Sequence, residues 1–132
     1  MSKVVVGAAI VRDGLLLAQC RAEPAELAGR WELPGGQVEE GESERTALRR
    51  ECREELGALV HVHDRLGPDL RLSPRSVLRV YLAELVAGSP EPRPLEHLEL
   101  RWVPPAAMDD LDWLPADRLL LPDLAAATRP HP

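Results

Sequence analysis

Residues 36–57 read GQVEEGESERTALRRECREELG, a charged segment with a glycine at each end. Ser43 is a residue type that caps the amino terminus of a helix, and Glu44 suits the first turn because of the helix dipole. Gly57 suits the left-handed conformation that commonly follows a last turn. The segment therefore predicts a helix that begins after Ser43 and ends at about Leu56.

Three glutamates of this helix share one face. Glu51, Glu54 and Glu55 are spaced i, i+3 and i+4, so their side chains project within about a quarter turn of one another. They lie near the carboxyl end of the helix, where the dipole disfavours anions, and Arg50 and Arg53 offset part of the repulsion. A hard divalent cation, which prefers carboxylate oxygens, would resolve this conflict. The alternative is a solvated helix face with ordinary ion pairs.

The opposite face of the helix is apolar. Leu48, Cys52 and Leu56 recur every four residues and can pack against a sheet. The sequence places no histidine or asparagine near Cys52 that would activate a thiol, so we interpret Cys52 as a small core residue.

Outside the helix, most segments have the patterns of strands. Strands are predicted over residues 4–11, 15–20, 31–33, 59–66, 77–86 and 98–103. Asp13 and Gly14 predict a hairpin turn after the first of these strands. Pro34 and the glycines that follow it predict the end of the strand over residues 31–33. Pro115 and Pro122 fit the first turns of short terminal helices. Strands combined with one long central helix indicate an α/β layered domain.

Length and composition limit the classes of protein. The chain has 132 residues, which predicts a single domain over residues 1–132, and its net charge of −6 argues against a nonspecific hold on DNA or RNA. No apolar run is long enough to cross a bilayer, and the start lacks a signal-peptide pattern. We expect a cytoplasmic protein without membrane or nucleic-acid partners, whose Cys20 and Cys52 are reduced. The sequence does not indicate the oligomeric state.

The histidines are not spaced as metal ligands. His61, His63, His97 and His131 form no metal constellation in the sequence. His61 and His63 alternate on one predicted strand, so we expect both at the surface.

With its spacing, the charged segment resembles the Nudix box. That signature runs Gly, five residues, Glu, seven residues, Arg-Glu, an apolar residue, any residue, Glu-Glu, any residue, Gly and an apolar residue. In this chain these places hold Gly36, Glu42, Arg50, Glu51, Cys52, Glu54, Glu55, Gly57 and Ala58. Cys52 and Ala58 are smaller than the usual apolar residues, whereas every charged and glycine place matches.

The resemblance extends along nearly the whole chain. Residues 28–36 resemble the run before the box in MutT-like enzymes. Residues 111–118 resemble the tail of the MutT-like (deoxy)nucleoside triphosphate pyrophosphohydrolases, with the CTP-preferring bacterial members nearest. The resemblance implies a Nudix-type α/β/α sandwich around a mixed β-sheet.

The same resemblance implies a metal site. Glu51, Glu54 and Glu55 would bind Mg²⁺ or Mn²⁺, together with the backbone carbonyl of Gly35 or Gly36. Glycine at these places lets the backbone come close to the metal, which a side chain would block.

Further residues take roles by resemblance. Arg50 would orient the carboxylates, and Glu42 would pair within the loop and helix. MutT-like enzymes also use an acid from a later loop, and Glu96, six residues before Trp102, is the best positional match. Glu99 is the second choice, and a plain surface role for Glu96 is the alternative.

The resemblance also implies substrate contacts. Arg21 matches a position that contacts substrate phosphate, although it can equally be a solvated arginine, and Gln37 stands where some relatives have lysine. Asp117 would recognise the base, with Trp113 or Leu33 as a wall of the pocket. An ionised Asp117 only accepts hydrogen bonds and favours a base with an amino group, such as cytosine, whereas a protonated one would remove that preference. The alternative role for Asp117 is helix capping.

The implied reaction is metal-assisted hydrolysis of a nucleoside triphosphate, such as CTP, dCTP or oxidised dGTP, to the monophosphate and pyrophosphate. Glu51 or Glu96 would be the general base. One rival is a Nudix hydrolase of ADP-ribose or another nucleoside diphosphate derivative, which often has a proline sixteen residues past the box, where this chain has Pro74. Another is a Nudix-fold binding module without turnover, which the intact set of box carboxylates disfavours.

Overall fold

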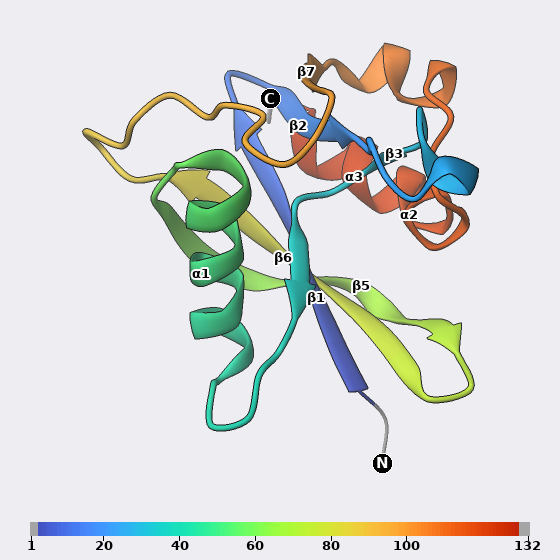
Figure 1. Ribbon diagram of the computed structural model, residues 1–132. Helices are drawn as coiled ribbons and strands as arrows, with labels where there is room; N and C mark the ends of the chain where they lie inside the picture. The colour runs from blue at the N-terminus through green and yellow to red at the C-terminus, as the bar shows by residue number, and fades with distance from the viewer. Residues whose placement is uncertain (1–2, 130–132) are drawn as a thin grey trace.

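A mixed β-sheet with helices on both faces forms the fold (Figure 1). This description comes from a computed structural model and covers residues 3–129, so His131 lies outside it. The strands are β1 (Lys3–Arg12), β2 (Leu15–Cys20), β3 (Trp31–Glu32), β4 (Gly35–Gln37), β5 (Val60–Ser73), β6 (Ser76–Leu85) and β7 (Glu99–Val103). The helices are α1 (Glu44–Leu56), α2 (Pro115–Leu119), α3 (Leu121–Thr128) and the 3-10 helices η1 (Ala25–Leu27) and η2 (Pro105–Asp110).

Strand β1 joins the two halves of the sheet. It runs parallel to β6 from Lys3 to Ile10, and its last residues pair antiparallel with β2. β5 extends the sheet beyond β6, while β3 and β7 both pair with β2. Short β4 pairs antiparallel with β1 from Val5 to Gly7, which brings the glycines before α1 onto the middle of the sheet.

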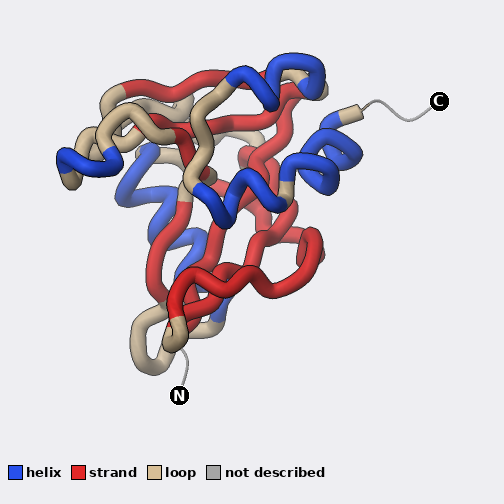
Figure 2. Tube along the Cα trace, turned by 90° about the vertical axis from the view of Figure 1, so that its right-hand side faces the viewer, coloured by secondary structure: helices blue, strands red, loops and turns tan. Residues whose placement is uncertain are grey.

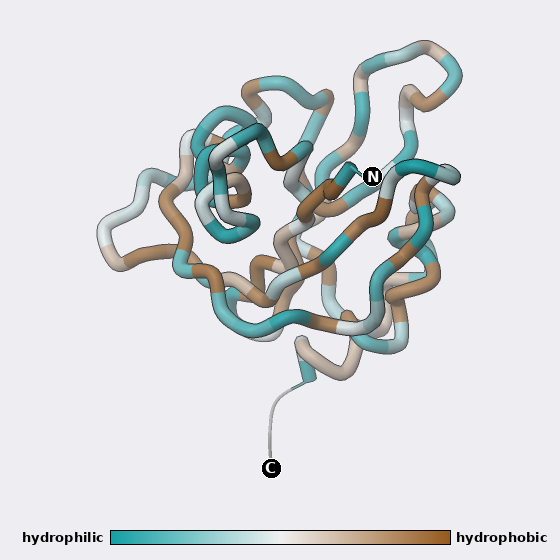
Figure 3. Tube along the Cα trace, turned by 90° about the horizontal axis from the view of Figure 1, so that it is seen from below, coloured by the Kyte–Doolittle hydropathy of each residue, from teal (hydrophilic) through white to brown (hydrophobic). Residues whose placement is uncertain are grey.

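Each face of the sheet buries its own apolar core. The face under α1 packs Val6, Ala8 and Ile10 of β1 with Ala47, Leu48, Cys52 and Leu56 of α1. The other face packs Ala9, Leu16 and Val80 with Met108, Trp113, Leu120 and Leu124. Neighbouring side chains of β1 alternate between the two cores, as Ala8 and Ala9 do. Figure 3 shows how hydrophobic and hydrophilic stretches are distributed along the chain. With α1 on one side of the strands and α2 and α3 on the other (Figure 2), the predicted α/β/α sandwich is confirmed.

Helix α1 has the predicted ends. The Ser43 side chain accepts a hydrogen bond from the backbone N–H of Thr46 at 3.1 Å, and Gly57 ends the helix with a φ of 66°. Pro115 and Pro122 occupy first turns of α2 and α3, also as predicted. Cys52, on the buried face of α1, is fully buried, and both cysteines are free. Within residues 3–129, no helix is long and apolar enough to cross a membrane.

Two strand predictions are wrong in extent. β5 continues past Leu66 to Ser73, because register shifts in its pairing with β6 accommodate Gly67 and Pro68 within one long hairpin. At Pro34 the chain does break from β3, but it re-enters the sheet at once as β4, which begins at Gly35.

Candidate active site

A cavity of about 730 Å³ lies beside the carboxyl half of α1. Part of its wall is polar and contains Arg21, Glu32, Glu51, Glu55, Glu96 and His97. Another part is mostly apolar and contains Val5, Leu33, Leu72, Leu78, Leu114 and Asp117. The cavity therefore joins a carboxylate cluster to an apolar wall with one further acid.

Glu51 lies directly against the glycine backbone before α1. A Cβ atom on Gly36 would be 2.4 Å from Cδ of Glu51, so only glycine leaves room for this carboxylate. Burial raises the pKa of Glu51, although the hydrogen bond from Arg50 acts in the opposite direction. A second glycine-dependent contact lies next to it, because a Cβ on Gly35 would be 1.9 Å from the carbonyl oxygen of Val6. These glycines let the backbone lie close to the Glu51 carboxylate and to β1.

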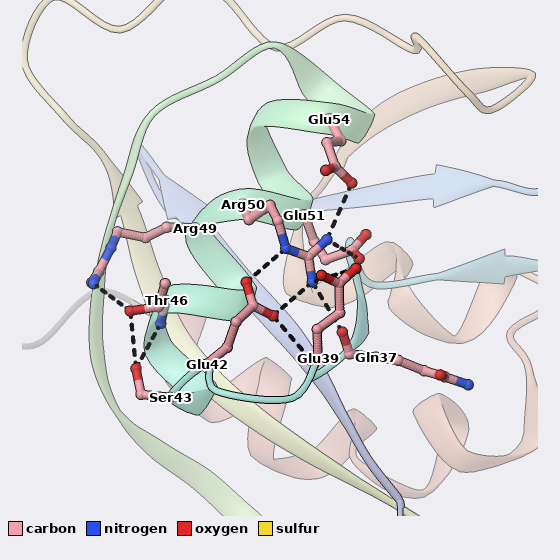
Figure 4. Close-up of polar contacts among 9 residues, drawn as sticks. All are labelled: Gln37, Glu39, Glu42, Ser43, Thr46, Arg49, Arg50, Glu51 and Glu54. Carbon is pink, nitrogen blue, oxygen red and sulfur yellow. Dashed lines mark hydrogen bonds and ion pairs between the residues drawn. The ribbon is translucent and has the colours of Figure 1, made fainter.

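Arg50 is the centre of the hydrogen bonds around the box (Figure 4). Its guanidinium donates to both oxygens of Glu42, at 2.8 and 2.9 Å, and to Oε1 of Glu51 at 2.8 Å. It also reaches Oε2 of Glu54 at 3.3 Å and the carbonyl of Gln37 at 3.1 Å. The hydrogen bond from Arg50 lowers the pKa of Glu42 to about 2, so this pair stays charged at neutral pH. The arrangement fits an orienting role for Arg50.

The three box glutamates differ in their surroundings. Glu55 is 4% exposed, and its Oε1 accepts the backbone N–H of Gly35 at 2.9 Å. Burial raises the pKa of Glu55 above that of an ordinary glutamate. The Glu54 side chain is 51% exposed beside Arg50 and is not among the residues that line the cavity. The structure thus brings Glu51 and Glu55 into the cavity, and leaves Glu54 at its outside.

Of the two candidates for the later acid, only Glu96 lines the cavity. Its negative charge is one of the influences that raise the pKa of Glu51. Glu99 lies on β7, where its carboxylate accepts a hydrogen bond from Arg101 at 3.4 Å. The geometry favours Glu96.

Sequence reasoning missed a polar cluster behind Glu55. Glu32, Glu55 and His97 have ligand-type atoms within 4.8 Å of one another. Nε2 of His97 lies 2.9 Å from Oε2 of Glu32, and Nε2 of Gln19 donates to Oε2 of Glu55 at 2.8 Å. The sequence pattern relates His97 only to the other histidines and does not connect it with these carboxylates. These residues come from four distant segments, and the position of His97 next to Glu96 was the one available signal.

Arg21 lies at the edge of this cluster. It lines the cavity, and its Nη1 donates to Oε1 of Glu32 at 3.0 Å. The side chain is 30% exposed, so it is neither a fully solvated arginine nor a buried one. This places a guanidinium where it can meet an anionic substrate.

Asp117 faces the cavity and caps no helix. It is the third residue of α2, and its Oδ2 accepts the backbone N–H of Leu33 at 3.0 Å, across the fold. Burial raises the pKa of Asp117 to about 7. Leu33 lines the cavity, as a pocket wall would. Trp113 does not, so its predicted place in the wall is wrong: it is fully buried in the core and donates its indole N–H to the carbonyl of Met108 at 2.7 Å.

The cavity suits a hard divalent cation. Its lining includes the acids Glu51, Glu55 and Glu96 together with Gly35 and Gly36, and Mg²⁺ and Mn²⁺ prefer carboxylate and carbonyl oxygens as ligands. The space that Gly36 leaves for the Glu51 carboxylate supports this fit, because a larger residue would push one donor away.

Comparisons with known proteins agree with this geometry. A family model described as the NUDIX domain matches residues 1–124. A protein of Mycobacterium tuberculosis, provisionally named 8-oxo-dGTP diphosphatase 2, is 49% identical over 128 residues, which cover 95% of this chain and 89% of that protein. The CTP pyrophosphohydrolase of Escherichia coli is 34% identical over 128 residues, covering 97% of this chain and 95% of the relative.

Solved structures of related proteins share the fold of this chain. The solution structure of the Escherichia coli ORF135 protein has a TM-score of 0.80 and 34% identity, and the match covers 99% of this chain and 95% of that one. The crystal structure of a MutT NUDIX hydrolase from Burkholderia pseudomallei has a TM-score of 0.77 and 36% identity, covering 93% and 98%.

Proposed function

The chain belongs to the NUDIX domain family and is a hydrolase of nucleotide derivatives, and from this premise we propose a specific reaction. The substrate is a (deoxy)nucleoside triphosphate. The products are the nucleoside monophosphate and pyrophosphate. The reaction depends on Mg²⁺ or Mn²⁺.

One observation carries the proposal. A single cavity holds the carboxylates of Glu51, Glu55 and Glu96 and, in the same space, the Asp117 carboxyl beside Leu33. A nucleoside triphosphate has the matching parts, namely a polyphosphate that binds metal and a base with an apolar face and polar edge. Arg21 supplies a cation to a cavity otherwise rich in acids.

The residues divide the chemistry between them. A divalent ion bound there would neutralise phosphate charge and make a water nucleophilic near neutral pH. Glu51, Glu55 and Glu96 would hold this ion. The exposed side chain of Glu54 would have to turn toward the cavity to join them. Arg50 keeps Glu51 oriented, and Glu51 or Glu96 accepts the proton of the attacking water.

Arg21 and Asp117 would bind the two ends of the substrate. Arg21 binds phosphate. Asp117 recognises the base edge, and Leu33 packs against the base. The names of the relatives point to CTP and to 8-oxo-dGTP, so we propose a CTP-type or oxidised dGTP substrate for this chain.

The test is hydrolysis of a nucleotide panel with Mg²⁺. The panel holds the four NTPs, the four dNTPs, 8-oxo-dGTP and ADP-ribose, assayed with the wild type and with Glu55→Gln. Glu40→Gln, an exposed acid in the loop before α1, is the matched control. We expect release of pyrophosphate from triphosphates, kept by Glu40→Gln and lost by Glu55→Gln.

Two results would contradict the proposal. Turnover of ADP-ribose alone would favour a hydrolase of nucleoside diphosphate derivatives. Metal binding without any turnover would favour a binding module.

A further inference from the structure

Two acidic side chains lie against each other behind the metal-binding part of the cavity. Glu55 is 4% exposed, and the side chain of Glu32 is 14% exposed. Gln19, which is fully buried, donates from Nε2 to Oε2 of both, at 2.8 Å for Glu55 and 3.3 Å for Glu32. Nε2 of His97 lies 2.9 Å from Oε2 of Glu32 and 3.7 Å from Oε2 of Glu55. Such a pair is costly unless its charge is compensated.

Protein donors, rather than a metal ion, provide that compensation. Both oxygens of Glu32 accept N–H groups, one from Arg21 and the other from Gln19 and His97. Both oxygens of Glu55 accept N–H groups too, one from the Gly35 backbone and the other from Gln19. A cation placed between Glu32 and Glu55 would displace these donors and lie near the Arg21 guanidinium.

We propose that His97, together with Gln19, is a positioning residue that fixes the Glu55 carboxylate for the divalent ion. The inference rests on the proposed function, which makes Glu55 a metal ligand. Groups behind a ligand commonly set its orientation, and their loss weakens metal binding about 10- to 100-fold.

His97 also connects Glu55 with the loop that carries Glu96. The backbone N–H of Leu95 donates to the carbonyl of Glu55 at 3.1 Å, and that of Leu98 donates to the carbonyl of Cys20 at 2.9 Å. The two bonds hold the loop on either side of Glu96 and His97. The backbone thus fixes His97 next to Glu96 and places its Nε2 3.7 Å from the Glu55 carboxylate.

The imidazole ring of His97 contacts the carboxylates through only one of its two nitrogens. The side chain is 9% exposed, and Nδ1 has no hydrogen-bond partner. Nε2 faces a carboxylate, so it is the donor. This asymmetry gives a matched pair of variants, because a glutamine amide extends to about the position of Nε2, whereas the shorter asparagine amide overlaps Nδ1.

The experiment measures Mn²⁺ binding to the full chain without nucleotide, by EPR of free Mn²⁺, for His97→Gln and His97→Asn. We expect His97→Asn to raise the Mn²⁺ dissociation constant about 10-fold or more, and His97→Gln to change it less than about 3-fold. His63→Asn is the control, since Nε2 of His63 also lies 2.8 Å from a glutamate, Glu84, on exposed β-strand surface. Circular dichroism confirms that each variant is folded.

A folded His97→Asn with wild-type Mn²⁺ affinity would overturn the inference. Pulsed EPR is a second, independent test. Nitrogen coupling from His97 to bound Mn²⁺ would show that the imidazole is itself a ligand, and would also overturn the inference. Mn²⁺ binding without hydrolysis of any triphosphate would contradict the proposed function alone, since the comparison of the variants does not depend on turnover.

Discussion

The Glu51 carboxylate occupies the space that a side chain at Gly36 would fill, with Cδ 2.4 Å from the position of that Cβ. The glutamate comes from the carboxyl half of α1 and the glycine from β4, so the contact fixes how the helix and the strand meet. It explains in physical terms why the segment needs glycine at this place.

Replacing this glycine should separate activity from stability. In Gly36→Ala the flexible Glu51 side chain moves aside, so we expect kcat/KM to fall about 10- to 100-fold. The free energy of unfolding should change by less than about 1 kcal/mol, because the displaced atoms belong to a movable side chain. Steady-state kinetics and urea unfolding measure the two quantities. Wild-type kcat/KM in the variant would contradict the importance of the contact.

Arg50 should not tolerate lysine. Its planar guanidinium bonds to Glu42, Glu51 and Glu54 at once, which a single ammonium group cannot reproduce. We expect Arg50→Lys to lower the free energy of unfolding by about 1–2 kcal/mol and to raise the Mg²⁺ concentration needed for half-maximal rate. Arg49→Lys is the control, because Arg49 is exposed and makes a 3.4 Å bond to Thr46. Equal effects of the two variants would argue against an orienting role for Arg50.

Asp117 should make base preference depend on pH. Its pKa is raised to about 7, so the carboxyl is mainly protonated below that pH and mainly ionised above it. The ionised form accepts from the amino group of cytosine and repels the carbonyl of uracil, whereas the protonated form can donate to that carbonyl. The ratio of kcat/KM for CTP to that for UTP should therefore rise from about pH 6 to about pH 8.

The ratio cancels effects of pH that are common to both nucleotides. Asp117→Asn has no titrating group at this place, so its ratio should stay constant over the same range. A ratio that does not change with pH in the wild type, or that rises equally in Asp117→Asn, would contradict a role for Asp117 in base recognition.

Trp113 should affect folding and not substrate choice. The indole is fully buried and donates to the Met108 carbonyl, and Trp113→Phe leaves that oxygen without its partner. We expect a loss of about 1–3 kcal/mol in the free energy of unfolding, with an unchanged ratio of CTP to UTP hydrolysis. By contrast, Leu33→Ala should raise KM for every nucleotide, because Leu33 lines the cavity. A changed base preference in Trp113→Phe would show that Trp113 takes part in substrate binding after all.

The local features of the fold were predictable from the sequence. The bounds of α1 follow from Ser43 and Gly57, whose preferences act over one turn of chain. The extension of β5 to Ser73 was not predictable, because bulges opposite β6 depend on the partner strand. The same holds for β4, whose glycines form a strand through their pairing with β1.

The residues of the candidate site, too, were only partly predictable from the sequence. The box spacing indicated Glu51 and Glu55, since neighbours on one helix face are fixed by the helical period. The cluster of Gln19, Glu32 and His97 depends on contacts between residues far apart in the sequence, which no local pattern reveals. Trp113 was misplaced because an aromatic residue beside a site residue fits a pocket wall and a core equally well.

The most direct test of the proposed function is the position of the broken bond in CTP. The products of complete hydrolysis with Mg²⁺ are separated and quantified for the wild type, for Glu55→Gln and for the wild type with chelator. We expect equal amounts of CMP and pyrophosphate from the wild type, and almost no product in the other two reactions. Formation of CDP and phosphate, or turnover that persists in Glu55→Gln or with chelator, would contradict a metal-dependent pyrophosphohydrolase built on this site.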